Sequence, residues 1–181
     1  MKPVGDQPWM PSDAVNFFGD IVRNMQDEKS EGDLVKVLEF GSGGSTVWLD
    51  KAGCRVVTIE HNFKWHGRVR KQTTWHTFHI YHQRPYAGVC DLFPDELFDI
   101  VLVDGRDRLE CGQAAMRLVA RDGWMILDDA NRHRYAQLHR DLNLEGWEKT
   151  KKVSTDATLD MVQNAPNKTR TTAFFRRPPH V

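Results

Sequence analysis

The chain has 181 residues, which is enough for one domain with a sizeable hydrophobic core and too few for two comfortable ones. Hydrophobic residues make up 40% and charged residues 28%, as is typical of globular proteins. Lysine plus arginine equals aspartate plus glutamate, at 25 each, so no global charge favours DNA, RNA or an anionic membrane as the partner.

No apolar run approaches the ~20 residues that span a bilayer, and the first six residues lack the apolar core of a signal peptide. Three cysteines, at positions 54, 90 and 111, are widely spaced and form no CxxC pair. We therefore expect reduced thiols and a cytoplasmic location. We also expect a single domain over 1–181, with an N-terminal arm (1–11), a core (12–177) and a tail (178–181).

A helix over about 13–27 is predicted first, because apolar residues recur there at helical spacing after Ser12, a good N-cap. The run from Val35 to Phe40 then suits a strand that is buried on both faces. Gly41, Gly43 and Gly44 follow it, at a turn that exposes backbone N–H groups, and a short helix comes next. A strand, a glycine-rich turn and a helix N-terminus together indicate a nucleotide or nucleoside site, although a simple tight turn has the same signature.

Residues 55–60 are β-branched and form the second predicted strand. Asn62 can cap a basic helix reaching about residue 73, whose charges we interpret as a solvated face rather than a nucleic-acid contact. A third strand fits 77–82. His79 and His82 would point to opposite faces of that strand, so the histidines there do not predict a metal site.

The second half of the chain continues the alternation of strands and helices. A loop-rich connection (83–96) precedes a strand (98–103), a helix (109–120), a turn at Asp122-Gly123, a strand (124–127), a helix (132–142) and two final strands (147–153 and 170–175) with a polar loop between them. This order predicts an α/β, Rossmann-like, doubly wound and mostly parallel seven-stranded sheet with helices on both faces and an antiparallel last strand.

In such sheets ligands bind beyond the carboxyl ends of the strands. Glu60 ends the second strand, 19 residues after Gly41, which suits a carboxylate that binds ribose hydroxyls of either NAD or S-adenosylmethionine. The GxGxxG pattern would need a glycine where the chain has Thr46, and Glu39 and Asp104 would repel a pyrophosphate. The same acids would attract the ammonium and sulfonium groups of S-adenosylmethionine, which is therefore the favoured cofactor.

The stretch from Val37 to Thr46 resembles the first motif of class I S-adenosylmethionine-dependent methyltransferases, in a GSGGST variant. The stretches 57–62, 98–106 and 123–129 are similar to the second, fourth and fifth strands of small bacterial and viral members. The resemblance covers about residues 12–177. It implies that the cofactor's methionine and ribose are lined by Gly41, Ser42, Gly43, Gly44, Ser45 and Thr46.

The resemblance also implies that Glu60 holds the ribose and that His61 lies beside the adenine. Where the family often has an acid that binds the adenine amine, this chain has Gln83, which can accept the same hydrogen bond. Tyr86 either stacks on the adenine or covers the core.

Methyl transfer is an in-line displacement, so orientation supplies most of the acceleration, and a base is needed only if the acceptor loses a proton. Asp104 and Asp129 are the candidate catalytic residues, with Asp128 and Asn131 nearby. Some catechol-type members bind a divalent cation with acids placed after these strands. The displaced spacing of Asn131 makes such a metal possible but not favoured, and helix capping by Asp129 or Asn131 is the preferred alternative.

Basic residues on the two loops that follow strands four and five favour an anionic or sugar-phosphate acceptor, unless these loops are simply solvated. The basic residues are Arg106, Arg108, Arg132, His133 and Arg134. The sequence thus predicts a methyltransferase for a small-molecule acceptor, with no nucleic acid or membrane partner favoured. Two alternatives remain: a protein that binds S-adenosylmethionine or S-adenosylhomocysteine without turnover and, less favoured, an NAD(P)-dependent oxidoreductase.

Overall fold

The computed structural model describes residues 4–154 and 169–179. Its seven-stranded sheet has the order β3-β2-β1-β4-β5-β7-β6. Only β7 runs against the rest, because it pairs antiparallel with both β5 and β6. The predicted Rossmann-like, mostly parallel sheet is therefore confirmed. The strands are β1 (Lys36–Phe40), β2 (Arg55–Glu60), β3 (Thr77–Tyr81), β4 (Phe98–Val103), β5 (Val119–Leu127), β6 (Glu148–Ser154) and β7 (Arg170–Arg176).

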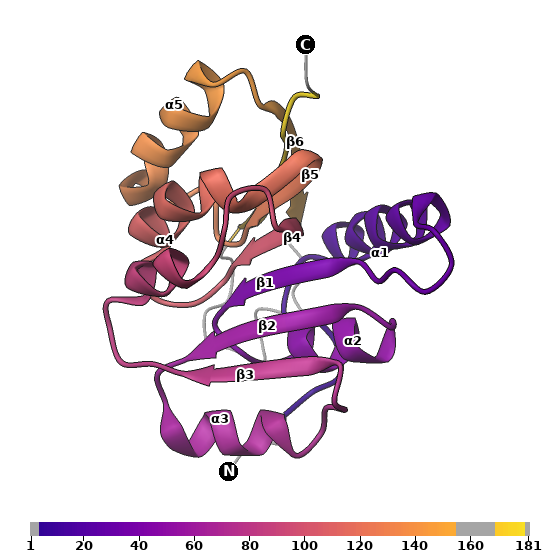
Figure 1. Ribbon diagram of the computed structural model, residues 1–181. Coiled ribbons are helices and arrows are strands. Elements are labelled where there is room, and N and C mark those ends of the chain that lie inside the picture. Colours follow the sequence, from indigo (N-terminus) through magenta and orange to yellow (C-terminus); the bar gives the residue numbers. More distant parts are fainter. Residues whose placement is uncertain (1–3, 155–168, 180–181) are drawn as a thin grey trace.

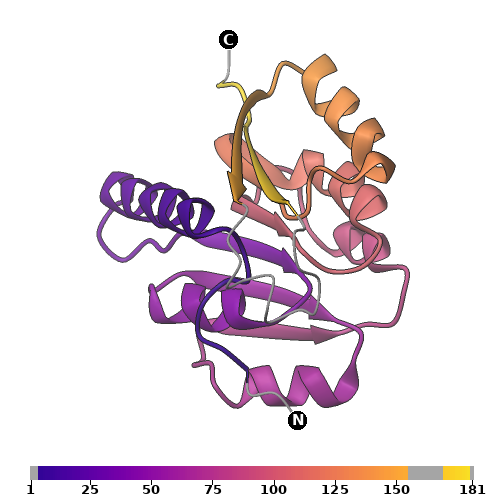
Figure 2. The ribbon, with the colours of Figure 1, turned by 180° about the vertical axis from the view of Figure 1, so that it is seen from behind.

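Helices cover both faces of the sheet (Figures 1 and 2). One face carries α1 (Ser12–Glu28) and α2 (Gly44–Lys51), and the other carries α4 (Arg108–Ala115) and α5 (Ala136–Leu144). The helix α3 (Phe63–Arg70) lies beside β3 at one end of the sheet. Three short 3-10 helices complete the described part of the chain: η1 (Tyr86–Leu92), η2 (Met116–Leu118) and η3 (His133–Tyr135).

Alternate residues of the central strands supply two separate cores. In β1, Leu38 and Phe40 pack toward α4 and α5, whereas Val37 packs toward α1 and α2. In β4, Val101 and Val103 face the first core, whereas Ile100 and Leu102 face the second. This double burial explains why both strands are mostly apolar in the sequence, with Lys36 and Glu39 as the exceptions in β1 and Asp99 in β4.

The chain leaves β1 for β2 and β3 on one side, and then returns to β4 on the other side of β1. The strand order therefore reverses between β1 and β4, where ligand sites of this fold lie. The loops after these two strands almost touch, because a Cβ atom at Gly41 would lie 2.6 Å from the Cα of Gly105. Gly41 also has a φ of +96°, so this position requires glycine twice over.

Three local predictions were wrong. Ser12 does not cap α1, because it is the first helical residue and Pro11 takes the cap position. The helix predicted over 109–120 ends at Ala115, and Val119 already belongs to β5. Asp122-Gly123 is not a turn between elements but lies within β5, at an irregularity in its pairing with β4. The predicted polar loop between β6 and β7 lies almost entirely outside the described residues.

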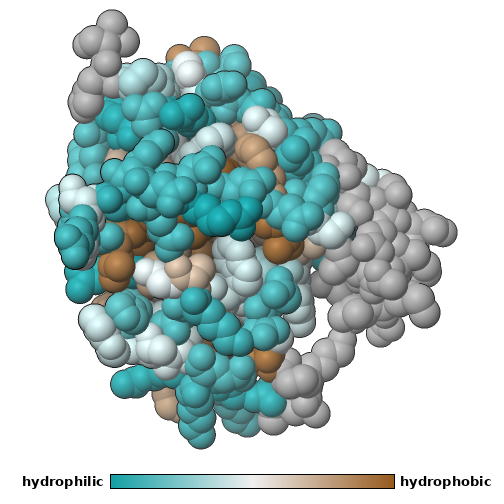
Figure 3. Space-filling view, turned by 90° about the vertical axis from the view of Figure 1, so that its right-hand side faces the viewer, coloured by the Kyte–Doolittle hydropathy of each residue, from teal (hydrophilic) through white to brown (hydrophobic). Residues whose placement is uncertain are grey.

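The molecular surface seen in Figure 3 is mostly hydrophilic, with hydrophobic residues in small separate patches. Within the described ranges, no helix combines the length and the apolar character that a membrane crossing requires. All three cysteines are buried and unpaired.

Candidate functional site

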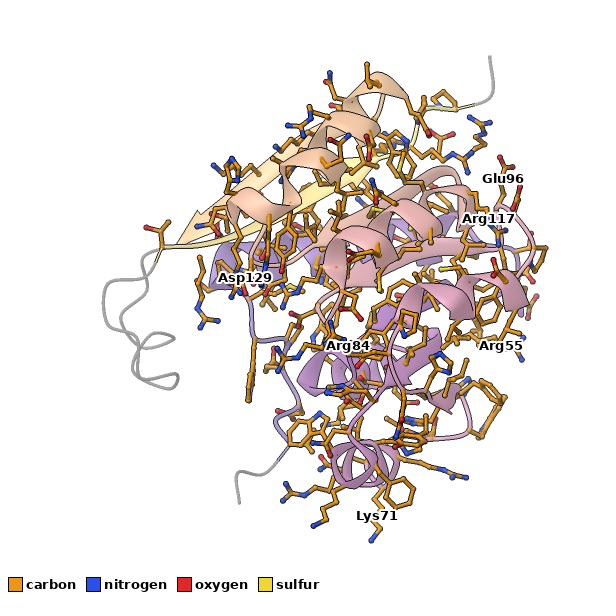
Figure 4. The ribbon with its side chains drawn as sticks, turned by 90° about the vertical axis from the view of Figure 1, so that its left-hand side faces the viewer. Arg55, Lys71, Arg84, Glu96, Arg117 and Asp129 are labelled. Atoms are coloured by element: carbon orange, nitrogen blue, oxygen red, sulfur yellow. The ribbon has the colours of Figure 1, made fainter. Side chains whose placement is uncertain are left out.

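A cavity of about 730 Å³ opens at the carboxyl edge of β1, β2, β4 and β5. Figure 4 views this edge and labels Arg84 and Asp129, two residues of its lining that come from different loops. Most of the residues predicted for the site line this one cavity: Gly41, Ser42, Gly43, Gly44, Ser45, Glu60, His61, Asp104 and Asp129. Glu39, Thr46 and Gln83 do not line it.

The glycine turn is fixed from several sides. The N–H of Gly41 donates to the carbonyl of Ile59 (2.8 Å), and that of Gly43 donates to the Thr46 hydroxyl (2.8 Å). Gly44 packs against the N-terminal arm so closely that a Cβ there would lie 2.1 Å from the carbonyl oxygen of Gln7. Gly43 differs, because a Cβ at this position would meet nothing within 4 Å. The turn therefore offers open space to a ligand at Gly43.

Glu39 lies fully buried behind the turn. Its carboxylate accepts hydrogen bonds from the hydroxyls of Ser45, Thr46 (2.5 Å) and Thr58 (2.7 Å). Burial raises its pKa to about 7; the three hydroxyl donors oppose that rise, and the charge of Glu60 adds to it. These contacts make Glu39 and Thr46 supports of the turn, behind the cavity wall.

Glu60 lines the cavity at the end of β2. One carboxylate oxygen accepts from the Asn62 N–H (2.7 Å) and lies 2.9 Å from Nδ1 of His61, while the other lies 3.4 Å from the Ser42 hydroxyl. The second oxygen therefore has only a weak partner and can accept from a ligand hydroxyl.

Tyr86 is buried, and its hydroxyl accepts from the His61 N–H (3.1 Å) and contacts the His61 ring. It is thus a core residue that also lines the cavity, and its stacking on an adenine stays a prediction. Gln83 is exposed outside the cavity, where its amide donates to the Tyr81 hydroxyl (3.3 Å).

Three aspartates at the ends of β4 and β5 surround one guanidinium. Arg108 donates to the Asp104 carboxylate (2.8 Å), and its Nη1 lies 3.6 Å from carboxylate oxygens of both Asp128 and Asp129. Burial raises the pKa of Asp104 well above its usual range, and the charge of Asp128 adds to this while Arg108 opposes it. Burial likewise raises the pKa of Asp128, against the attraction of Arg108. The site therefore holds carboxyl groups that bind protons more tightly than usual.

The contacts of the residues considered for a metal point elsewhere. Asp129 pairs with Arg132, and the Asn131 amide donates to the Thr169 carbonyl (3.1 Å). Across the residues that the structure describes, no three or more His, Cys, Asp or Glu side chains are grouped to hold a metal ion. The capping prediction was wrong, since neither Asp129 nor Asn131 caps a helix; η3 and α5 follow Arg132 and Tyr135, without side-chain caps.

The sequence interpretation did not single out several residues of the lining. Trp65 of α3 donates its indole N–H to the Ser42 carbonyl (2.7 Å), and Trp9 reaches the cavity from the N-terminal arm. Tyr135 and Arg170 also line the cavity. None of the four belongs to a recognisable motif, and Trp9 and Arg170 reach the site from segments that are remote in the sequence. Arg108 was predicted to border the acceptor, but its side chain is only 11% exposed and pairs with the aspartates at the ends of β4 and β5.

No protein-family model matches the chain, and no curated protein matches its sequence. Solved structures do resemble it. Cofactor-bound Rv0187 from MTB has a TM-score of 0.68 at 18% identity, covering 97% of this chain and 85% of that one. The precorrin 8w decarboxylase encoded by MT0146 of Methanobacterium thermoautotrophicum gives 0.65 at 15%, covering 97% and 99%.

N-methyltransferase NodS from Bradyrhizobium japonicum WM9, in complex with S-adenosyl-L-homocysteine, gives a TM-score of 0.58 at 16% identity, covering 96% of this chain and 89% of NodS. Likeness at such low identity is evidence of shared architecture. This chain has the Rossmann-like fold that is found in solved methyltransferases such as NodS.

Proposed function

We propose that this protein is an S-adenosylmethionine-dependent methyltransferase that acts on a small-molecule acceptor. The observation that carries the proposal is the lining of the cavity beside β1 and β2. It joins the open glycine turn to the carboxylates of Glu60 and Asp104, whereas the arginines of the lining come from later segments, between residues 84 and 134 and at the start of β7. This surrounding suits a cationic nucleoside and disfavours a pyrophosphate.

The residues fit S-adenosylmethionine from one end to the other. The turn from Gly41 to Ser45 would line the methionine and ribose, Glu60 would accept from the ribose hydroxyls, and His61 would lie beside the adenine. Asp104 would face the ammonium group. Glu39 and Thr46, which were predicted as direct ligands, would act through the turn that they support. A place for Gln83 in binding remains a prediction.

When bound there, S-adenosylmethionine would supply an activated methyl group to a lone pair of the acceptor, and its sulfur would keep the electron pair of the broken carbon–sulfur bond as S-adenosylhomocysteine. The protein orients the two reactants and takes up a proton if the acceptor releases one. Asp104 and Asp129 are the candidate bases. The raised pKa of Asp104 suits this role, because a carboxylate that binds protons more tightly is a stronger base.

The size of the cavity supports a small acceptor. Its volume of about 730 Å³ lies within the ~300–1,000 Å³ common for small-molecule sites. S-adenosylmethionine would fill only part of it, which leaves the end near the β4 and β5 loops for the acceptor.

Thermal unfolding with S-adenosylmethionine, S-adenosylhomocysteine and NAD in parallel tests the proposal. We expect both sulfur nucleosides to raise the melting temperature and NAD to have no effect. Stabilisation by NAD alone would overturn the proposal and favour the oxidoreductase.

A second candidate, binding without turnover, is supported by the pairing of the acids. Asp104 and Asp128 lie against Arg108, and Asp129 lies against Arg132, so each candidate base already has a cationic partner. Tight S-adenosylhomocysteine binding with no methyl transfer to a broad acceptor panel would favour this candidate.

A further inference from the structure

The end of the cavity away from the glycine turn is rich in arginine. Arg106 comes from the loop after β4, Arg132 and Arg134 come from the loop after β5, and Arg170 opens β7. No lysine of the described ranges lines the cavity. Guanidinium groups bind phosphate and carboxylate through paired N–H donors, which a lysine cannot do.

Part of this charge is already neutralised. Arg84 donates to Asp107 (2.7 Å), Arg132 pairs with Asp129, and Arg108 serves the acids at the ends of β4 and β5. Glu110, which also lines the cavity, acts electrostatically on Arg84. The aspartates at the end of the cavity away from the glycine turn are therefore paired with Arg84, Arg108 and Arg132.

Asp107 and Asp129 hold their arginines from strained positions. Their φ angles are +50° and +52°, a left-handed conformation that is unfavourable for a residue other than glycine and is concentrated at functional sites. In the described part of the chain, they are the non-glycine residues with positive φ that line the cavity. The two strained residues are thus those that hold Arg84 and Arg132 in place.

Two further arginines of the lining, Arg106 and Arg134, differ from these and from Arg170, which has an interaction of its own. Both are exposed and line the cavity, and neither forms an ion pair within the described residues. The Arg134 guanidinium lies 5.0 Å from the ring centroid of Tyr135, which is 3% exposed. Stacking of this kind positions a guanidinium while leaving its in-plane N–H donors available.

We propose that the acceptor carries an oxyanionic group, a phosphate or a carboxylate, which Arg106 and Arg134 bind with Arg132 beside them. This inference rests on the proposed function, because it assigns the part of the cavity that S-adenosylmethionine leaves open. The acids around Arg108 would then separate a cationic cofactor from an anionic acceptor, and the uncharged reacting atom would lie between them.

The test uses the full chain saturated with S-adenosylhomocysteine, titrated calorimetrically with inorganic phosphate, acetate and neutral glycerol at constant ionic strength in chloride. We expect phosphate or acetate to bind and glycerol not to bind. Arg106→Gln and Arg134→Gln should each weaken binding by about fivefold or more, as for the loss of a charge-assisted hydrogen bond. The ion that binds more tightly identifies the group.

Arg55→Gln is the matched control, because Arg55 is exposed at the start of β2, at the opposite edge of the sheet. Equal weakening by Arg55→Gln would show attraction by net charge alone and overturn the inference. Absence of binding by both anions, in protein that binds S-adenosylhomocysteine, would overturn the inference and leave the proposed function intact. If S-adenosylhomocysteine itself does not bind, the proposed function fails, and the same titration of the free protein decides whether the anion site exists.

Discussion

At the residue scale, the glycines of the turn after β1 serve two different purposes. Gly41 and Gly44 are packed against backbone atoms of Gly105 and Gln7, so a side chain at either position would displace main chain. Gly43 has a φ of 178°, an extended conformation open to any residue, and it faces unoccupied space. The first two glycines therefore shape the turn, whereas Gly43 keeps the cavity clear.

Gly43→Leu is expected to abolish binding of S-adenosylhomocysteine, with a loss of at least about 100-fold, while the protein remains folded. A Cβ at position 43 meets no atom within 4 Å, so the backbone there tolerates a side chain, which would occupy space in the cavity that Gly43 lines. Calorimetric titration measures the affinity, and circular dichroism checks the fold. Gly88→Leu is a matched control, because Gly88 is exposed and a Cβ there also meets nothing within 4 Å. Unchanged affinity in Gly43→Leu would refute the assignment of the turn to the cofactor.

Glu39 is expected to make stability depend on pH. Burial raises its pKa from 4.5 to about 7, so the folded state favours the protonated form. The contribution of Glu39 to the unfolding free energy is fully present below about pH 4.5. As the pH rises to about 7, this contribution falls by about 3 kcal/mol. The difference in unfolding free energy between the wild type and Glu39→Gln should fall by this amount. Urea titrations of both proteins between about pH 4.5 and 7 measure this difference in unfolding free energy. A difference that does not change with pH would contradict the prediction.

At the scale of elements, Arg108 ties the start of α4 to the ends of β4 and β5. Its removal would leave Asp104 and Asp128 without their cationic partner in a buried place, which typically costs 3–5 kcal/mol. We therefore expect Arg108→Met to lower the unfolding free energy by about 3 kcal/mol or more at neutral pH. Chemical denaturation provides the measurement.

Two comparisons separate this charge effect from lost packing. The added substitution Asp128→Asn should recover part of the loss, because it removes one of the uncompensated charges. Arg106→Met should change the unfolding free energy by less than about 0.5 kcal/mol, since Arg106 is exposed and has no ion pair in the described part of the chain. Equal losses in the single and double variants would show that Arg108 acts through packing.

The sequence predicts the central strands well because burial on both faces leaves a strong apolar signal in β1 and β4. It fails at Asp122-Gly123, a pair typical of turns. Here Asp122 adopts a φ of +59°, and a Cβ at Gly123 would lie 2.7 Å from the Asp99 carbonyl oxygen. The pair thus forms an irregularity where β5 passes close to β4, and tertiary strand pairing overrides the local turn preference.

The cavity was predictable where its residues follow a strand directly. The end of a parallel strand fixes where the next side chain lies, as for Glu60 and Asp104. The ends of β1 and β2 do not reveal that Glu39 turns inward to three hydroxyls, because residue type alone does not specify which face of a pleated strand a carboxylate occupies. Trp9 and Arg170 depend on how remote segments pack, which local patterns do not encode.

At the scale of the whole molecule, the cavity lies at the carboxyl ends of the parallel strands. Its lining combines residues from the N-terminal arm, from four parallel strand ends and from β7. The opposite side of the sheet, at the amino ends of the parallel strands, carries the loops that lead into these strands. A ligand that fills the cavity should therefore order one edge of the molecule and leave the other edge unchanged in its local motions.

Hydrogen exchange with and without S-adenosylhomocysteine tests this asymmetry. At 100 times its dissociation constant the ligand adds about 2.7 kcal/mol to the unfolding free energy, so core amides that exchange by global unfolding should slow by about 100-fold. Amides that exchange by local opening should slow only at the cavity, in 41–45, 60–65, 104–110 and 128–135. Those at the opposite edge, in 71–76 and 145–147, should keep their rates. Because local opening at that edge breaks no ligand contact, equal slowing of both sets would place the ligand elsewhere and contradict the cavity assignment.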